Sequence, residues 1–199
     1  MKEIIIATKN KGKAKDFEQL LEPMGYKVLT LHDVAPHMDV EETGETFEAN
    51  AILKAEAIAQ ELQATVIADD SGLEIDALDG EPGVYSARYS GDERNDESNI
   101  DKVLQKMVQV PDSEKTARFR CVLALASPGK ETILFEGTCE GLITDERKGE
   151  NGFGYDPIFY VPALDKTMAE MKPSEKASVS HRGNAIRELG KAMPGLSGN

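Results

Sequence analysis

The first 70 residues alternate short apolar segments with amphipathic ones, and this order constrains the fold more than any other feature of the chain. Apolar, β-branched residues at 2–8, 26–31 and 64–70 predict three strands. Between them, residues 13–22 and 46–63 carry apolar side chains at helical spacing, which predicts two helices. A β-α-β-α-β order is typical of an α/β sheet with at least some parallel strands.

The second half of the chain predicts a different arrangement. Residues 116–143 contain two long apolar segments joined through a Ser-Pro-Gly-Lys turn, which predicts a β-hairpin. We expect a helix over 96–108, a short strand at 158–161 and a C-terminal helix from about Ser180 to Met193.

No internal repeat or low-complexity linker divides the chain. We therefore expect residues 1–193 to form one α/β domain of two lobes. The remaining residues, 194–199, are expected to be a disordered tail.

Charge and composition exclude several classes of protein. The net charge of −13 disfavours a nucleic-acid-binding protein, which needs a basic face. No segment approaches the ~18 apolar residues of a membrane span, and the N-terminal segment does not match a secretory signal. We therefore expect a cytoplasmic protein with no membrane partner. Cys121 and Cys139 are too far apart to suggest a metal site and are expected to be buried and reduced.

Positive charge gathers in one segment of this acidic chain. Lys9, Lys11, Lys13 and Lys15 all lie in the sequence TKNKGKAK, directly after the first predicted strand. Where a strand turns into a helix, helix N–H groups, the helix dipole and ammonium groups can together bind a phosphate. The spacing is not that of a Walker motif. Lysines in such a loop are also commonly just solvated, and the segment alone fits that explanation slightly better.

Acidic residues gather in two places. Glu41 and Glu42 lie outside the predicted helix, where the helix dipole does not explain them. Asp69 and Asp70 follow a predicted buried strand, either as turn formers or as ligands of Mg²⁺ or Mn²⁺, which prefer oxygen. Because ligands of open α/β sheets gather beyond the carboxyl ends of strands, we expect this pair and the lysine-rich segment to share one site. A carboxylate beside a metal can also accept a proton from an attacking water.

A third group of candidates could contact a base. Phe153 lies between two glycines, where its ring could stack on a nucleobase or fold back onto its own core. Asp156 precedes a proline and fits a turn as well as a binding role. His181 and Arg182 offer donors for a base carbonyl or a phosphate. Lys54 could reach the same site or form a surface ion pair, and the sequence alone favours the surface.

Five segments together resemble a known family. They are, in order, ATKNKGK, EETGETFEANAILKA, ADDSGLEIDALDGEPGVYSARYSG, GENGFGYDPIF and SHRGNA. Over residues 2 to about 193 the chain closely resembles the inosine triphosphate pyrophosphatases, also called XTP/dITP diphosphatases. The resemblance implies an α/β fold with a long twisted mixed β-sheet flanked by helices, two lobes with a central substrate cleft, and a homodimer. It also implies hydrolysis of non-standard purine nucleoside triphosphates (dITP, ITP, XTP) to the monophosphate and pyrophosphate with Mg²⁺, which Mn²⁺ could replace.

The same resemblance implies roles for individual residues. Asp70 would activate the water that attacks the α-phosphorus, and Glu41 and Asp70 would hold the metal. Asp69, Lys54 and Glu42 would support this site, and whether Glu42 shares the metal with Glu41 stays open. The residues that would bind substrate are Thr8, Lys9, Asn10, Lys11, Gly12, Lys13, Ser71, Phe153, Gly154, Tyr155, Asp156, Lys176, His181 and Arg182.

Three other functions stay open. A haloacid-dehalogenase-type phosphatase also has acidic residues after a strand, but it uses a D-x-D spacing, whereas Asp69 and Asp70 are adjacent. A non-catalytic nucleotide-binding regulator needs the lysine-rich segment and Phe153 but no metal-binding carboxylates. The septum-inhibitor-like nucleotide pyrophosphatases share a two-lobed α/β design but tend toward pyrimidine or modified substrates.

Overall fold

The structure, a computed structural model, describes residues 2–196. Its strands are β1 (Lys2–Ile6), β2 (Tyr26–Thr30), β3 (Val66–Ile75), β4 (Thr116–Ala126), β5 (Ile133–Ile143), β6 (Phe159–Val161) and β7 (Lys166–Thr167). Its α-helices are α1 (Lys11–Leu21), α2 (Leu31–Val34), α3 (Phe47–Leu62), α4 (Asp96–Met107), α5 (Pro173–Val179) and α6 (His181–Leu196). Short 3₁₀ segments connect several of these elements.

The seven strands form one mixed sheet in the order β2-β1-β3-β4-β5-β6-β7. β1 pairs in parallel with both β2 and β3, because helices α1 and α3 return the chain to the same end of the sheet. β6 pairs antiparallel with β5 and with β7. The predicted α/β class, the initial β-α-β-α-β order and the β4–β5 hairpin are therefore confirmed.

The chain divides into two compact units. The first comprises Met1–Asp70, Cys121–Gly137 and His181–Asn199, and the second comprises Ser71–Arg120 and Thr138–Ser180. Strands β3, β4 and β5 contribute residues to both units.

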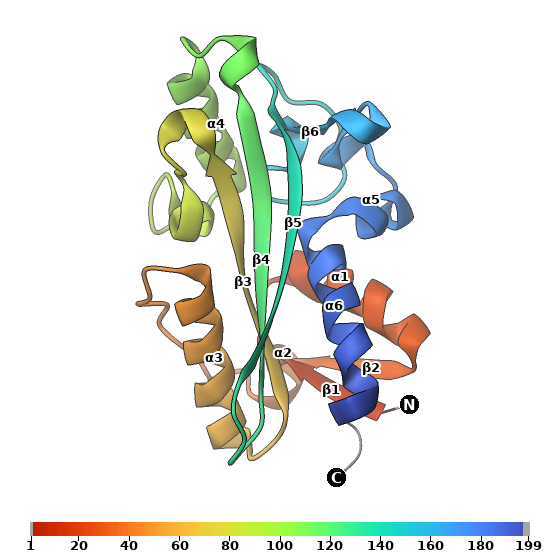
Figure 1. Cartoon of the computed structure of the whole chain (residues 1–199). Helices are drawn as coiled ribbons and strands as arrows, with labels where there is room; N and C mark the ends of the chain where they lie inside the picture. Colours follow the sequence, from red (N-terminus) through yellow and green to blue (C-terminus); the bar gives the residue numbers. More distant parts are fainter. Residues whose placement is uncertain (1, 197–199) are drawn as a thin grey trace. The chain divides into compact units, whose positions relative to one another are not determined.

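In the first unit, helices cover both faces of the strands. α1 and α6 contact each other and share a core with Ile4, Ile6, Ile67, Leu123 and Leu125 of the strands. α3 lies on the other side of β3, β4 and β5 from α6 (Figure 1). Close packing of α6 requires glycine at position 137, because a Cβ there would lie 2.2 Å from the carbonyl oxygen of His181 and 2.3 Å from the backbone nitrogen of Ala185.

The second unit has a core of its own. Helix α4 contributes Ile100, Val103 and Met107, which are buried with side chains of β3, β4, β5 and β6. The rings of Phe119 and Phe159 pack with their centroids 4.4 Å apart. The two cysteines, one in each unit, are buried and free, as expected.

Two elements, β3 and α6, extend further toward the C-terminus than the sequence predicts. The third strand does not end at Asp70, as we expected, but continues to Ile75, because Leu73 and Ile75 are buried in the core of the second unit. β1 ends at Ile6, which pairs with Ile67 of β3, so the two aspartates lie in the middle of β3 but beyond the end of β1. Helix α6 extends to Leu196, so residues 194–196 of the expected tail are helical, and 197–199 lie outside the described residues.

Within residues 2–196, none of the helices has the length and hydrophobicity that a transmembrane helix needs.

Candidate active site

The lysine-rich segment forms the turn from β1 into α1. Asn10 is the N-cap of the helix, and its Oδ1 accepts the backbone N–H of Lys13 at 3.0 Å. Oγ1 of Thr8 accepts the N–H of Asn10 at 3.1 Å, and Nε2 of His32 lies 3.1 Å from the carbonyl oxygen of Lys9. The first turn of α1 contains no acidic residue, so its N–H groups and dipole can attract an anion.

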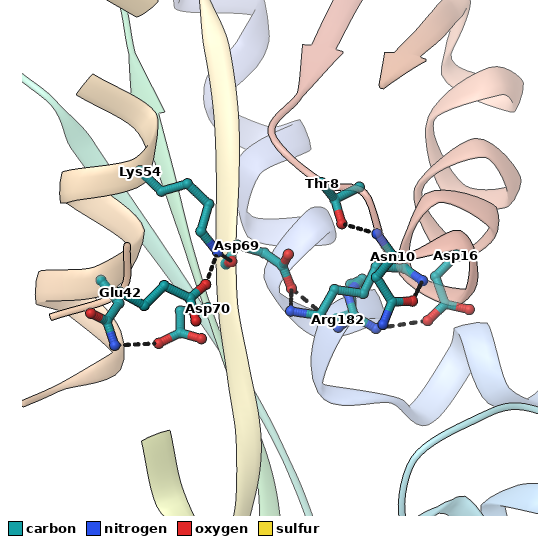
Figure 2. A network of polar contacts seen from close by, with 10 residues as sticks. Thr8, Asn10, Asp16, Glu42, Lys54, Asp69, Asp70 and Arg182 are labelled. Carbon is teal, nitrogen blue, oxygen red and sulfur yellow. Dashed lines mark hydrogen bonds and ion pairs between the residues drawn. The ribbon is translucent and has the colours of Figure 1, made fainter. Parts of the chain in front are cut away.

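Asp69 and Asp70 are adjacent in β3 but belong to different networks (Figure 2). Oδ2 of Asp69 lies 3.1 Å from Nζ of Lys13 in α1 and 3.1 Å from Nη2 of Arg182 in α6. Oδ2 of Asp70 instead accepts from Nδ2 of Asn50 in α3 at 3.0 Å. Successive side chains of a strand point to opposite faces, so Asp69 faces α1 and α6 while Asp70 faces α3.

The two carboxyl groups have opposite pKa shifts. Burial alone would raise the pKa of Asp69, but the positive charges of Lys13 and Arg182 outweigh burial and hold the pKa well below its usual range. Burial raises the pKa of Asp70 from 3.8 to about 6; Lys13 opposes this rise and the negative charge of Glu42 adds to it. Asp69 is therefore firmly ionised at neutral pH, whereas the fold disfavours the negative charge on Asp70.

Glu42 lies in this cluster, where its charge acts on Asp70, and the neighbouring Glu41 is exposed. Half-buried Glu42 forms an ion pair with Nζ of Lys54, which also donates to the carbonyl oxygen of Asp69 at 2.9 Å. Burial would raise the pKa of Glu42, but Lys54 lowers it overall. The surface position that the sequence favours for Lys54 is wrong, since its side chain is only 12% exposed.

Arg182 is buried between two elements of the first unit. Its Nη1 donates to Oδ2 of Asp16 in α1 at 2.7 Å, and its Nη2 donates to Asp69 in β3. Burial would lower the pKa of Arg182, but Asp69 and Asp16 raise it, so the guanidinium is permanently charged. The neighbouring His181, at the start of α6, is also buried. The substrate-binding roles of both residues stay predictions.

The aromatic loop, residues 151–157, lies in the second unit. Oδ2 of Asp156 accepts the backbone N–H of Phe153 at 3.1 Å and accepts from Nζ of Lys176 at 2.7 Å. The same ammonium group lies 4.8 Å from the centroid of the half-buried Phe153 ring, a cation–π contact. Gly152 has a φ of +79°, and a Cβ there would lie 2.0 Å from Oδ2 of Asp156, so this turn requires glycine.

The remaining residues of the loop are also fixed by hydrogen bonds. The backbone N–H of Gly154 donates to Oδ2 of Asp96, the first residue of α4, at 2.8 Å. The hydroxyl of buried Tyr155 donates to the carbonyl oxygen of Ser86 at 2.6 Å. Ser71, the first residue of the second unit, is half-buried in β3.

Comparison with known proteins identifies the family. The model of the Ham1 family matches residues 4–192. The chain belongs to the Ham1 family. A dITP/XTP pyrophosphatase of Halalkalibacterium halodurans is 58% identical over 191 residues, 96% of this chain and 98% of that protein. A dITP/XTP pyrophosphatase of Bacillus subtilis is 54% identical over 193 residues, which are 97% of this chain and 98% of that protein. The structure of the Staphylococcus aureus Ham1 protein has a TM-score of 0.87 at 52% identity and covers 98% of this chain and 100% of that chain.

In this Ham1-family chain, three residues that the sequence did not single out form hydrogen bonds with predicted site residues. Asn50 holds Asp70, Asp16 holds Arg182, and Asp96 holds the aromatic loop. Only Asn50 had a usable signal, since it is a polar residue within the apolar stripe of α3, four residues before Lys54. Across residues 2–196 no three or more His, Cys, Asp or Glu side chains gather in a way that could hold a metal ion.

Proposed function

We propose that this protein hydrolyses non-standard purine nucleoside triphosphates, namely dITP, ITP and XTP, to the nucleoside monophosphate and pyrophosphate. One observation carries the proposal: relatives that are 54–58% identical over nearly the whole chain are dITP/XTP pyrophosphatases. The buried carboxylates and the lysine-bearing helix start of the first unit supply chemistry that suits this reaction. Such an enzyme would remove damaged purines from the nucleotide pool.

The triphosphate is proposed to bind at the start of α1. The N–H groups of Lys11 and Gly12 lie in the first turn of this helix, where they and the dipole favour an anion. The side chains of Lys9 and Lys11 are exposed and can add positive charge beside a bound phosphate. Because Thr8 and Asn10 form the hydrogen bonds that shape this turn, their replacement should misplace the N–H groups as well as remove a direct contact.

The carboxylates fit a magnesium site. Mg²⁺ is usually bound by one or two carboxylates and by substrate phosphates, so a cluster of three protein ligands is not required. The negative charge of Glu42 disfavours the charge on Asp70, which a bound cation would relieve, and Glu41 is the neighbouring candidate ligand. The chemistry that Mg²⁺, or Mn²⁺ in its place, supplies when bound is neutralisation of charge on the phosphate oxygens.

Asp70 is proposed to be the catalytic base. Its carboxylate would accept a proton from the water whose oxygen attacks the α-phosphorus, while the bond from that phosphorus to the bridging oxygen breaks and pyrophosphate leaves. Asn50 holds one oxygen of this carboxylate in place. Asp69 has another role in this proposal: it keeps Lys13 and Arg182 in position through its two ion pairs.

The aromatic loop, Lys176 and the start of α6 are proposed to contribute the base contacts. Phe153, held by Asp156 and Lys176, would stack on the purine. Hypoxanthine and xanthine carry a carbonyl where adenine carries an amino group, so donors from Lys176, His181 or Arg182 would face a donor in ATP. An unpaired buried donor costs about 1–3 kcal/mol, so a few such contacts would reject ATP by orders of magnitude. Guanine shares the carbonyl, and its rejection would come from crowding at its 2-amino group.

Pyrophosphate release from a nucleotide panel, with and without Mg²⁺, tests the proposal. We expect rapid Mg²⁺-dependent turnover of dITP, ITP and XTP and slow turnover of ATP and GTP. Equal rates for all five would refute the base selection. Release of orthophosphate would indicate a phosphatase, a preference for pyrimidine or modified nucleotides a septum-inhibitor-like enzyme, and binding without turnover a regulator.

We further propose that residues 1–193 act as one catalytic domain, with the two units as its lobes, and that the protein is a cytoplasmic homodimer. The net charge of −13 supports a small-molecule substrate over nucleic acid as partner. Size-exclusion chromatography with light scattering tests the dimer.

A further inference from the structure

Helix α3 carries two polar side chains that connect the acidic loop before it to strand β3. Asn50 accepts the backbone N–H of Gly44 through Oδ1 at 2.7 Å and donates through Nδ2 to Oδ2 of Asp70 at 3.0 Å. One turn later, Lys54 contacts Glu42 in the loop and the carbonyl oxygen of Asp69 in the strand. Both side chains therefore link the same loop to the same pair of aspartates.

The contacts of Asn50 leave its amide group only one orientation. The residue is 1% exposed, and its oxygen and nitrogen face a donor and an acceptor respectively. Reversing the amide would place two donors together at Gly44 and two acceptors together at Asp70. The loop also packs directly on this amide, since a Cβ on Gly44 would lie 2.7 Å from Oδ1 of Asn50.

We propose that Asn50 is a positioning residue that sets the orientation of the Asp70 carboxylate relative to the loop that carries Glu41 and Glu42. The inference rests on the proposed function, in which Asp70 accepts the proton of the attacking water. A small error in the position of a reacting group strongly slows a reaction, because the bound geometry must already be close to that of attack. Partners of this kind, which orient metal ligands, typically change activity by about 10- to 100-fold when replaced.

The chain offers a matched control in the second unit. Asn99 is the fourth residue of α4, as Asn50 is of α3, and it is also buried. Its Oδ1 accepts the backbone N–H of Ser90 at 2.7 Å, which is the same kind of contact that Asn50 makes with Gly44. Replacing either asparagine removes a buried amide that holds a loop to a helix, but only Asn50 touches Asp70.

Two readouts test the proposal on the full-length protein. The first is hydrogen–deuterium exchange of the 41–46 segment without substrate or metal. The second is the kcat and KM of dITP hydrolysis with Mg²⁺. For Asn50→Ala we expect faster exchange in this segment and a kcat at least tenfold lower, with KM changed less than threefold. Asn99→Ala should lose similar thermal stability but keep kcat within threefold of the wild type.

Asn50→Asp separates the two hydrogen bonds. It keeps the acceptor for Gly44 and replaces the donor to Asp70 with a second carboxyl group, which cannot donate while it is ionised, so we expect exchange of the 41–46 segment to stay slow while kcat stays low. A purely structural role predicts instead that Asn50→Asp restores kcat, and that result would overturn the proposal.

Other results separate the failure of this inference from that of the proposed function. If the wild type releases no pyrophosphate, the proposed function fails. If the wild type is active and Asn50→Ala keeps its kcat, or if Asn99→Ala loses as much kcat as Asn50→Ala, only the role of Asn50 fails. Should Asn50→Ala not fold, as judged by circular dichroism, the same measurements are made on Asn50→Ser, whose hydroxyl is too short to reach both partners.

Discussion

Replacing Asp70 with asparagine is expected to stabilise the unliganded protein at neutral pH while abolishing turnover. Burial and the charge of Glu42 disfavour the ionised carboxylate, and the nearby charges of Lys13 and Lys54 and the hydrogen bond from Asn50 offset this only in part. An asparagine has no charge to disfavour, and its side-chain oxygen can still accept the hydrogen bond from Asn50.

The size of the effect follows from the pKa of Asp70, which the fold raises from 3.8 to about 6. In this range the native state binds more protons than the unfolded state, so the contribution of Asp70 to the free energy of unfolding falls as the pH rises. At about 1.4 kcal/mol for each pH unit between the two values, the total loss is about 3 kcal/mol. For a chain of this size, that corresponds to a difference in Tm of about 6–12 °C.

The assay is urea and thermal unfolding of the wild type and Asp70→Asn in EDTA between pH 4 and pH 8. Relative to the wild type, the free energy of unfolding of Asp70→Asn should rise across this range and level off above pH 7. Asp69→Asn is the control with the opposite sign. Because the pKa of Asp69 is lowered, Asp69→Asn should be less stable than the wild type at neutral pH, with the difference shrinking as the pH falls below about 4.

A constant difference between Asp70→Asn and the wild type from pH 4 to pH 8 would refute this reasoning, because it would mean that the fold does not disfavour the charge on Asp70. Retention of activity by Asp70→Asn would separately remove this residue as the catalytic base.

Three further predictions follow from the described contacts. Arg182→Met removes the partner shared by the buried carboxylate of Asp69 and the half-buried carboxylate of Asp16, and should lower the free energy of unfolding in urea by about 3–5 kcal/mol; a loss below about 1 kcal/mol would contradict the ion pairs of buried Arg182. Phe153→Ala should raise KM for dITP about tenfold or more with little change in kcat, since base stacking contributes about 1–3 kcal/mol; an unchanged KM would exclude stacking. Adding Mg²⁺ should raise the Tm of the wild type but not that of Asp70→Asn, and equal shifts would place the ion elsewhere.

Periodicity predicted most of the fold because the apolar pattern of each element matches the face it buries. The stripe of α3, for example, includes Phe47, Ala51 and Ala55, which are all buried. The end of β3 could not be predicted in this way. Asp, Ser and Gly are typical of turns, whereas the strand continues because residues further along it, such as Leu73, are buried in a second core.

The site was harder to predict than the fold, because its contacts join distant parts of the chain. Arg182 and Asp69 are 113 residues apart, and no spacing rule connects them. Because Asp69 and Asp70 are adjacent in the sequence, they also suggested a pair of ligands for one metal ion. The geometry of the strand instead directs their side chains to different helices. The motifs indicated which residues gather at the site but not which of them contact one another.

Because Asp69 and Asp70 point to opposite faces of β3, the site depends on the number of residues that precede them in the strand. Deleting one residue between 66 and 68 would turn each aspartate toward the other face and would move Asp70 into the place where Lys13 and Arg182 now hold Asp69 ionised. An insertion or deletion here should therefore displace both aspartates at once, whereas loops can absorb a change in length.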